Sequence, residues 1–426
     1  MRVYLQALGC RLNEAELETW SRDCRAHGYS LADSAEQADL VVINTCAVTG
    51  ESVRKSRQLI RRARRDNPLA KLVVSGCYAS LEPEAGAAEL GIDLLVANAD
   101  KDRLIDIAAR RLDLPVMPES ATEPGENALL ARGRQRAFVK VQDGCRYRCA
   151  FCIVTKARGD ERSRPVGEVV DEVNRIHAEG TQEVVLTGVH LGGYGGDHAA
   201  DLPTLVRTLL ADTDIPRIRL GSLEPWEISD DLWPMFEDPR LLPHLHLPLQ
   251  SGADSVLRRM SRRCRTAEFR ALATRARSAA PGFNITTDII VGFPGESDAE
   301  WRQTLAFTEE MAFGHVHIFA YSPRAGTKAA GMPQQITRAA KRQRSEQLHA
   351  LARRSRRQAL QQAIGQRFDV LIEGAEDGAA GWSGYTPNYL RVALAAGHGD
   401  ALENRIVTVR GVDITADGAR LQVEAV

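Results

Sequence analysis

The sequence predicts an α/β protein with three folded parts: a doubly wound parallel sheet at the N-terminus, a parallel partial (βα)6 barrel in the centre, and a small antiparallel β-barrel at the C-terminus. Two observations carry this prediction. Apolar runs alternate with helix-period stretches over most of the chain, and short strands broken by Gly and Asp fill the tail from Gly365. With 426 residues, 44% of them hydrophobic, the chain is too long for one ordinary core.

The N-terminal domain is predicted over residues 1–112. Its expected strands are residues 3–8, 40–44, 71–75 and 94–97. Its expected helices include residues 13–27 and 51–65. This βαβα order is typical of a doubly wound parallel sheet. The Pro- and Gly-containing residues 113–132 that follow are predicted to form a linker.

The central domain is predicted over residues 133–364. Its expected strands are residues 137–141, 183–187, 217–220, 244–249, 284–291 and 315–320. Its expected helices include residues 166–179, 267–279, 298–313 and a basic helix over 336–364. Six βα units fit a parallel barrel or partial barrel, whose reactive groups belong at the carboxyl ends of the strands. The last domain, residues 365–426, has expected strands at 368–373, 389–394, 405–412 and 420–426.

Three cysteines lie directly after the first strand of the central series. Cys145, Cys149 and Cys152 stand in the segment Cys-Arg-Tyr-Arg-Cys-Ala-Phe-Cys. Structural zinc sites take four ligands, and iron–sulfur cubes are also usually held by four cysteines, so three thiolates leave one iron open. An open iron can bind a substrate or cosubstrate. The alternative is a zinc site completed by a distant histidine.

A second set of three cysteines belongs to the N-terminal domain. Cys10, Cys46 and Cys77 each follow an expected parallel strand. All three should emerge at one sheet edge, where ligands bind outside the carboxyl ends of the strands. The favoured interpretation is a second three-thiolate cluster, and the alternative is three unrelated buried small residues.

The other sequence features concern compartment and charge. No apolar run approaches the ~18 residues of a membrane span, and the N-terminus lacks the apolar stretch of a signal peptide, so a cytoplasmic protein is expected. In that reducing compartment disulfides are not expected. Cys24 and Cys264 are expected to be structural, with solvent access and oxidation left open for Cys264.

The net charge of −1 argues neither for nor against a nucleic-acid partner. Basic residues are, however, concentrated in blocks. Residues 54–65 and 341–357 each hold seven Lys or Arg. Such blocks can contact phosphates, and solvated helix faces are the alternative.

The cysteine loop with an aromatic residue before its last cysteine resembles the radical S-adenosylmethionine (SAM) enzymes. Other segments resemble one group of these enzymes, the methylthiotransferases. They are Leu-Gly-Cys-Arg-Leu-Asn (8–13), Asn-Thr-Cys-Ala-Val (44–48), Ser-Gly-Cys-Tyr-Ala (75–79), LHLPLQSG (245–252), TDIIVGFPGE (287–296) and YSPRAGT (321–327). The resemblance spans essentially the whole chain and implies a radical-SAM central domain. The tail is similar to a TRAM domain, an RNA- or substrate-binding barrel.

Two further segments narrow the resemblance. Val-Gln-Asp-Gly-Cys (141–145) and Leu-Thr-Gly-Val-His-Leu-Gly (186–192) are most similar to the branch that acts on N6-threonylcarbamoyladenosine at position 37 of tRNA. Sister branches modify isopentenyladenosine of tRNA or an aspartate of a ribosomal protein. The chain departs from the family pattern at Thr155 and Lys156, near the cluster, where Pro-Tyr often occurs.

The resemblance implies a transferase with two [4Fe–4S] clusters and SAM as cofactors. The cluster on the 145–152 loop would bind SAM at its open iron and cleave it to a 5′-deoxyadenosyl radical. The cluster on the N-terminal trio would carry the sulfur, a second SAM would methylate that sulfur, and the radical would activate adenine C2 to receive it. An external electron donor is also implied.

The residues assigned to SAM are Phe151, Gly188, Gly192, Glu224, Gln250, Ser251, Val291 and Gly292. The glycine turn 188–193 would approach the methionine moiety, with a plain turn as the alternative. Glu224 would accept a hydrogen bond from the SAM amino group, or else contact only solvent. Gln250 and Ser251 are candidates for the ribose hydroxyls, and Val291 and Gly292 would border the adenine, since glycine lets a flat ring approach the backbone. Phe151 is the aromatic residue before the last cysteine of the loop. His244 and His246 are expected to be hydrogen-bonded structural histidines.

The residues assigned to the tRNA substrate are Arg324, Lys328, Trp382, Tyr385 and Tyr389. The two cations follow the sixth strand and would meet phosphate or a carboxylate, with a surface salt bridge as the alternative. The aromatics are candidate platforms for unstacked anticodon-loop bases, and core packing is the alternative for at least one of them. A monomer without membrane contact is expected. The rival of a different class is a non-enzymatic RNA-binding or redox-sensing protein with zinc at its thiols.

Overall fold

The computed structural model describes residues 1–81, 84–115, 135–198, 200–375, 381–395 and 402–426. The predicted linker therefore lies almost entirely outside the described residues. The chain divides into two compact units. The first comprises Met1–Ala131, Asp143–Arg162 and Ser322–Ala330, and the second comprises Arg132–Gln142, Ser163–Tyr321 and Gly331–Val426. The domain limits 1–112, 133–364 and 365–426 remain a prediction.

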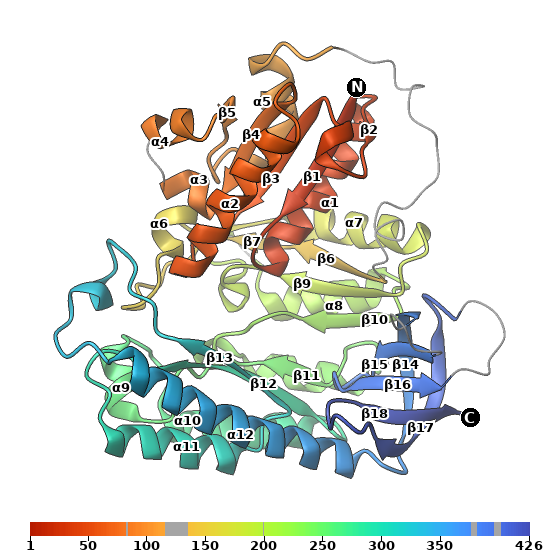
Figure 1. Ribbon diagram of the computed structural model, residues 1–426. Coiled ribbons are helices and arrows are strands. Elements are labelled where there is room, and N and C mark those ends of the chain that lie inside the picture. Colours follow the sequence, from red (N-terminus) through yellow and green to blue (C-terminus); the bar gives the residue numbers. More distant parts are fainter. Residues whose placement is uncertain (82–83, 116–134, 199, 376–380, 396–401) are drawn as a thin grey trace. The chain divides into compact units, whose positions relative to one another are not determined.

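A five-stranded parallel sheet forms the core of the first unit (Figure 1). Its order is β2-β1-β3-β4-β5. The strands are β1 (Arg2–Ala7), β2 (Ser30–Leu31), β3 (Leu40–Thr45), β4 (Lys71–Gly76) and β5 (Leu94–Leu95). Every residue of β3 is buried, as is typical of a central parallel strand covered on both faces.

Helices cover both faces of this sheet, which confirms the predicted doubly wound fold. Val42 packs in one cluster with residues of α1 (Arg11–Ala26) and α5 (Leu104–Arg111). Its neighbour Ile43 packs in the other cluster, with residues of α2 (Gly50–Asp66) and α3 (Cys77–Leu81). The two residues face opposite ways because side chains alternate along a strand. The unit also contains α4 (Glu84–Glu89) and α6 (Val154–Arg158).

The second unit contains the six predicted parallel strands. They are β6 (Arg136–Lys140), β9 (Glu183–Thr187), β10 (Arg217–Leu220), β11 (His244–His246), β12 (Asn284–Val291) and β13 (His315–Ala320). They form two sheets of order β10-β9-β6 and β11-β12-β13. Parallel bridges from Ile218 to Leu241 and from Ser222 to His246 join β10 to β11. The six strands therefore follow one another in the order expected of a partial (βα)6 barrel.

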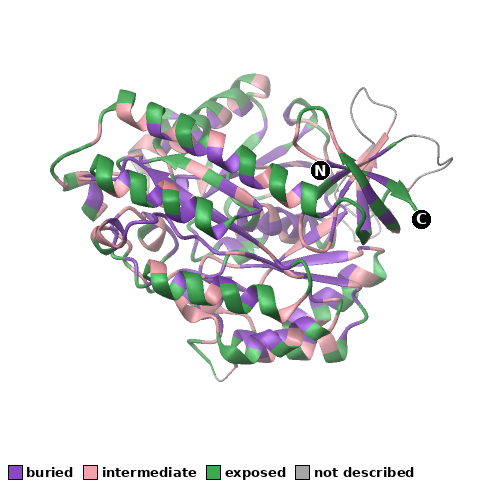
Figure 2. Cartoon of the chain, turned by 90° about the horizontal axis from the view of Figure 1, so that it is seen from below, coloured by how far each residue is buried: buried purple, intermediate pink, exposed green. Residues whose placement is uncertain are grey.

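Helices cover the outer side of these strands. They are α7 (Val166–Ala178), α8 (Leu202–Asp212), α9 (Asp254–Arg259), α10 (Thr266–Ala279), α11 (Asp298–Met311) and α12 (Arg338–Gln362). Figure 2 shows exposed and buried residues alternating along helices at the surface, the pattern of amphipathic helices packed on a sheet.

The tail forms a closed five-stranded barrel, also within the second unit. Its strands are β14 (Arg367–Ala375), β15 (Gly381–Tyr385), β16 (Arg391–Ala395), β17 (Ile406–Ile414) and β18 (Leu421–Ala425). The order is β14-β15-β16-β18-β17, and β16 pairs with β18 in parallel. The barrel is confirmed, but the prediction of a wholly antiparallel one is wrong at that pair.

Candidate functional site

The N-terminal cysteines lie at one edge of the first unit's sheet. Cys10, Cys46 and Cys77 follow β1, β3 and β4, which are neighbours in the sheet. The register places Asn44 beside both Ala7 and Ser75, so the three strands end at one level. Cys46 and Cys77 are buried, whereas Cys10 is exposed. The predicted convergence of the trio is what the fold produces.

Two glycines permit this close packing. Gly9 has φ +118°, and a Cβ there would lie 2.9 Å from Cys46 Sγ. Gly76 has φ +96°, and a Cβ there would lie 2.3 Å from the Thr45 carbonyl oxygen. Both positions combine a left-handed backbone with no room for a side chain, so glycine is required before two of the three cysteines.

The amide of Asn13 ties the ends of two strands together beside the trio. Its Nδ2 donates to the carbonyls of Leu8 at 2.7 Å and Thr45 at 3.1 Å, and Cys10 Sγ donates to its Oδ1 at 3.7 Å. Burial raises the pKa of the Cys46 thiol above its ordinary value. A bound metal would offset that effect, because it stabilises the thiolate.

The loop with Cys145, Cys149 and Cys152 belongs to the same unit as the N-terminal trio. All three cysteines are partly exposed. The backbone N–H groups of Tyr147 and Val154 donate to Sγ of Cys145 and Cys152, each at 3.4 Å. Such N–H···S bonds stabilise thiolate charge and tune the potential of an iron–sulfur cluster.

Arg158, which ends the short helix after this loop, joins the loop to the N-terminal sheet. Its buried guanidinium donates to Asp143 Oδ1 at 2.9 Å, to Glu16 Oε1 at 3.1 Å and to Asn13 Oδ1 at 2.8 Å. Burial by itself would lower the pKa of Arg158. The carboxylates of Glu16 and Asp143 outweigh burial and hold this pKa well above its ordinary value, so the guanidinium stays charged. The sequence analysis missed this residue, because its partners are remote in sequence.

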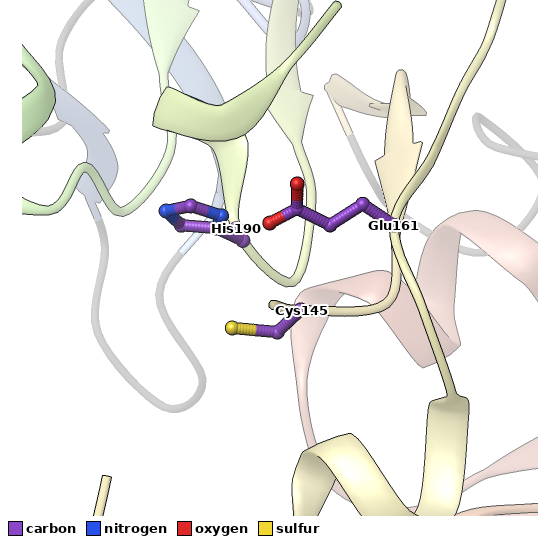
Figure 3. A group of neighbouring side chains, drawn as sticks. All are labelled: Cys145, Glu161 and His190. Carbon is purple, nitrogen blue, oxygen red and sulfur yellow. The ribbon is translucent and has the colours of Figure 1, made fainter. Parts of the chain in front are cut away.

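Further hydrogen bonds hold the loop in place. Asn98 Nδ2 donates to the Ala157 carbonyl at 2.6 Å, and the Ala329 N–H donates to the Ala150 carbonyl at 2.8 Å. Thr155, at the departure from the family pattern, donates its hydroxyl to the Tyr147 carbonyl at 2.9 Å. Figure 3 shows Cys145, at the start of the loop, close to Glu161, which follows α6 in the sequence. The loop and α6 are therefore bonded to other residues of their own unit.

The number and type of the donors in each trio suit an iron–sulfur cluster. Each trio offers three thiols, one fewer than the four ligands that a closed structural zinc site takes. In a cubane each thiolate binds a different iron, so three cysteines leave one iron without a cysteine ligand of the trio.

The glycine turn assigned to SAM lies in the second unit, after β9. A Cβ on Gly188 would lie 2.9 Å from Gln142 Oε1, and one on Gly192 would lie 2.9 Å from Glu227 Oε2. The His190 N–H donates to Gln142 Oε1 at 2.8 Å, and the His190 ring pairs with the Glu227 carboxylate. This buried His–Glu pair was missed, although the histidine stands inside the turn that was singled out.

Two other SAM-assigned residues are engaged within the protein. Arg262 donates to the Glu224 carboxylate at 3.0 Å. Ser251 is fully buried, its hydroxyl lies 3.1 Å from that of Thr304, and it accepts from the Ala253 N–H at 3.3 Å. The Ser251 hydroxyl therefore serves the turn before α9 in this structure.

The remaining SAM-assigned residues lie near strand ends or in the cysteine loop. Gln250 has φ +74° and is bonded through its backbone to β12. Val291 is fully buried at the end of β12, and a Cβ on Gly292 would lie 2.5 Å from Lys341. Phe151 is half-buried in the loop. Their contacts with SAM stay a prediction.

Comparisons with known proteins identify the family. Residues 2–97 match the uncharacterized protein family UPF0004, and residues 139–308 match the Radical SAM superfamily. The threonylcarbamoyladenosine tRNA methylthiotransferase MtaB of Bacillus subtilis (strain 168) is 34% identical over 411 residues, which cover 92% of this chain and 90% of that protein. The chain belongs to the radical SAM methylthiotransferase family. It is thus a transferase that works with SAM and two [4Fe–4S] clusters.

Other methylthiotransferases and one solved structure are also similar. The MtaB of Thermotoga maritima is 35% identical and covers 87% of this chain and 86% of its own length. The tRNA-2-methylthio-N(6)-dimethylallyladenosine synthase of Anaeromyxobacter sp. (strain K) is 37% identical and covers 96% and 91%. The radical SAM methyltransferase TsrM from Kitasatospora setae has a TM-score of 0.57 at 16% identity, covers 77% of each chain, and shares the fold.

The residues assigned to substrate lie in both units of this methylthiotransferase. In the first unit, Arg324 is half-buried and Lys328 is exposed. In the second unit, Tyr389 stacks on Tyr385 with ring centroids 4.7 Å apart and on His244 at 4.6 Å. The Tyr389 ring therefore packs within the protein. Core packing was the alternative to base stacking for these aromatic residues.

Trp382 and His244 both take part in packing within the second unit. Trp382 is half-buried against the core of the tail barrel. His244 is buried and lies 3.0 Å from Thr286 Oγ1, as expected of a structural histidine. None of the described helices combines the length and apolar composition needed to cross a bilayer.

Proposed function

We propose that this methylthiotransferase adds a methylthio group to C2 of N6-threonylcarbamoyladenosine at position 37 of tRNA, next to the anticodon. The observation that carries the proposal is the likeness to three proteins named threonylcarbamoyladenosine tRNA methylthiotransferase MtaB. They are 34–35% identical to this chain over 86–94% of their own lengths. The two cysteine trios within one compact unit support the same chemistry.

The proposed ligands of the SAM-cleaving cluster are Cys145, Cys149 and Cys152, and those of the second cluster are Cys10, Cys46 and Cys77. When bound, the clusters supply the electron that opens SAM and the sulfur that is transferred. The protein contributes three thiolates at each site and leaves one iron open for a ligand. The N–H groups of Tyr147 and Val154 donate hydrogen bonds to the sulfurs of Cys145 and Cys152, which stabilises negative charge on those sulfurs.

Arg158 acts as a positioning residue for both sites in this proposal. Its guanidinium contacts Asn13, which stands beside Cys10, and Asp143, which precedes Cys145 by two residues. Its fixed positive charge also lies near the thiols of Cys10 and Cys77. Arg158 therefore connects the two ligand sets through hydrogen bonds, and its positive charge reduces the electrostatic repulsion between neighbouring thiolates.

The proposed SAM contacts are the residues predicted from the sequence. The turn with Gly188 and Gly192, and the strand ends at Gln250 and Gly292, stay candidates for the methionine, ribose and adenine groups. Glu224 and Ser251 have protein partners, so their contact with SAM would require those bonds to be exchanged.

Exposed basic residues are proposed to attract the tRNA. In α2 they are Arg54, Lys55, Arg57, Arg61, Arg62 and Arg65. Lys328 is an exposed cation in the segment that bonds to the cysteine loop, and half-buried Arg324 lies in the same segment. Phosphate contacts from such residues position RNA without reading its sequence. The enzyme is proposed to work as a cytoplasmic monomer with an external electron donor.

One experiment tests the substrate. The protein is reconstituted anaerobically with iron and sulfide and incubated with SAM, a reductant and tRNA that carries threonylcarbamoyladenosine. We expect the 2-methylthio nucleoside together with 5′-deoxyadenosine by mass spectrometry. Protein that holds both clusters and cleaves SAM, yet leaves this tRNA unchanged, would refute the assignment.

A second candidate substrate is dimethylallyladenosine of tRNA. The 37% identity to the Anaeromyxobacter synthase favours it. The same assay with tRNA that carries that nucleoside distinguishes the two, since a strict preference is expected. A ribosomal-protein aspartate is the third substrate to test.

A further inference from the structure

We propose that His246, Asp288 and His317 form a binding site for a divalent first-row transition cation, such as Zn²⁺ or Fe²⁺, in the second unit. The residues come from the neighbouring parallel strands β11, β12 and β13. In the register, His246 lies opposite Thr286, and Asp288 lies opposite His317. Because Thr286 and Asp288 are two residues apart on one strand, the three side chains share one face of the sheet.

The donor atoms are close enough for one ion. His246 Nε2 lies 3.2 Å from Asp288 Oδ1, and one donor atom of each residue lies within 4.8 Å of the other two. Bonds of ~2.0–2.2 Å to a tetrahedral zinc place neighbouring ligands roughly 3.3–3.6 Å apart. His317 is exposed, and its ring lies edge-on to the His246 ring with centroids 5.5 Å apart.

The surrounding residues orient the ligands. Thr286 Oγ1 lies 2.9 Å from His246 Nδ1, which leaves Nε2 on the side of Asp288. A metal-bound histidine usually makes such a bond with its other nitrogen. The neighbouring His315 is bonded at Nδ1 by the Arg356 guanidinium, so it is not counted among the ligands.

The donor set indicates the class of ion. Two imidazoles and one carboxylate are the ligands of open zinc sites and of non-haem iron(II) sites, which keep positions for water or another oxygen ligand. The group shares no residue with the cysteine trios. Asp288 also precedes Val291, at the end of β12, by three residues, or about 10 Å of strand. A His246–Asp288 contact that holds no metal is the competing account.

Zinc binding to the cluster-loaded protein tests the site. The anaerobically reconstituted enzyme is dialysed against ⁶⁵Zn²⁺, with iron and sulfide measured in the same samples. We expect one zinc per chain beyond the cluster metals. His317→Phe and Asp288→Asn should each weaken that binding at least 10–100-fold at unchanged iron content. His349→Phe, which replaces an exposed histidine of α12, is the matched control and should bind zinc normally.

X-ray absorption at the zinc edge identifies the ligands. A shell of nitrogen and oxygen at about 2.0–2.1 Å, without sulfur at about 2.3 Å, is expected. Zinc–sulfur scattering, equal zinc binding by all variants, or no zinc binding at micromolar concentrations would overturn the proposal. The last result would leave only a direct contact between His246 and Asp288.

Discussion

Burial determines the reactivity of the Cys264 thiol. It is 5% exposed, and it donates to the Arg265 carbonyl at 3.3 Å. Burial, with smaller contributions from Glu268, Asp254 and Glu224, raises the pKa of Cys264 to about 12. The sequence had left open that Cys264, in a basic loop, is accessible to solvent. The structure shows that it is buried.

Cys264 should therefore resist alkylation by iodoacetamide at pH 9 in the folded enzyme. With a pKa near 12 in place of 9.0, its thiolate fraction at that pH falls roughly a hundred- to a thousand-fold. The reactive form increases only as the pH rises toward the raised pKa. Peptide mass spectrometry with and without urea measures this, and equal labelling in both samples would contradict it.

Gly76 tests how tightly the N-terminal trio is packed. Gly76→Ala places a Cβ 2.3 Å from the Thr45 carbonyl on a left-handed backbone, so the strand end must move. We expect the variant to lose one of its two clusters, measured as iron and sulfide per chain. Gly167→Ala, where a Cβ would meet nothing within 4 Å, should keep both.

The helices owe their boundaries to local chemistry. Ser297 accepts from the Glu300 N–H at 3.3 Å, and the Glu300 carboxylate accepts from the Ser297 N–H at 2.8 Å, so α11 begins with a capping box. Such starts are readable from sequence. Strand β15 was missed instead, because Gly381-Trp-Ser-Gly-Tyr385 lacks alternating apolar residues and pairs only through tertiary contacts.

Ser297→Ala should lower the free energy of unfolding by about 1 kcal/mol, because the first turn of α11 loses a hydrogen-bond acceptor. Urea unfolding followed by circular dichroism measures this change. Ser278→Ala, at an exposed position near the end of α10, should change stability by less than about 0.5 kcal/mol. Equal losses in the two variants would argue against the cap.

A buried ionic group joins the central strands to the tail barrel within the second unit. Glu183 accepts from Arg217 Nε at 2.7 Å and from Arg219 Nε at 2.9 Å. The same guanidiniums donate to the carbonyls of Asp369 and Pro387. Burial raises the pKa of Glu183, but Arg219 and Arg217 outweigh burial and hold it below its ordinary value.

Glu183→Leu should destabilise the second unit by about 3–5 kcal/mol, since two buried guanidiniums lose their counter-charge. We also expect faster proteolysis of the tail barrel, which is bonded to those guanidiniums. Glu424→Gln removes an exposed ion pair with Arg410 and should cost at most about 1 kcal/mol. An unchanged rate of proteolysis in Glu183→Leu would show that the packing of the tail barrel does not depend on this ionic group.

Binding of tRNA by the whole enzyme should depend steeply on salt. Replacing Arg61 and Arg65 of α2 with Gln should weaken binding at low salt and reduce the log–log salt slope by up to about 2, one per lost phosphate contact. Arg270→Gln, at a surface pair with Glu310, is the control. An unchanged slope in the α2 variant would exclude that helix from the interface.

The strand order and the two cysteine trios follow from local pattern. Burial on both faces makes parallel strands apolar throughout, and Cys10, Cys46 and Cys77 each stand where such a run ends. The grouping of Arg158 with Glu16, and of His246 with Asp288 and His317, has no such signal. Those contacts join residues remote in sequence, and only the packing of strands and loops brings them within bonding distance.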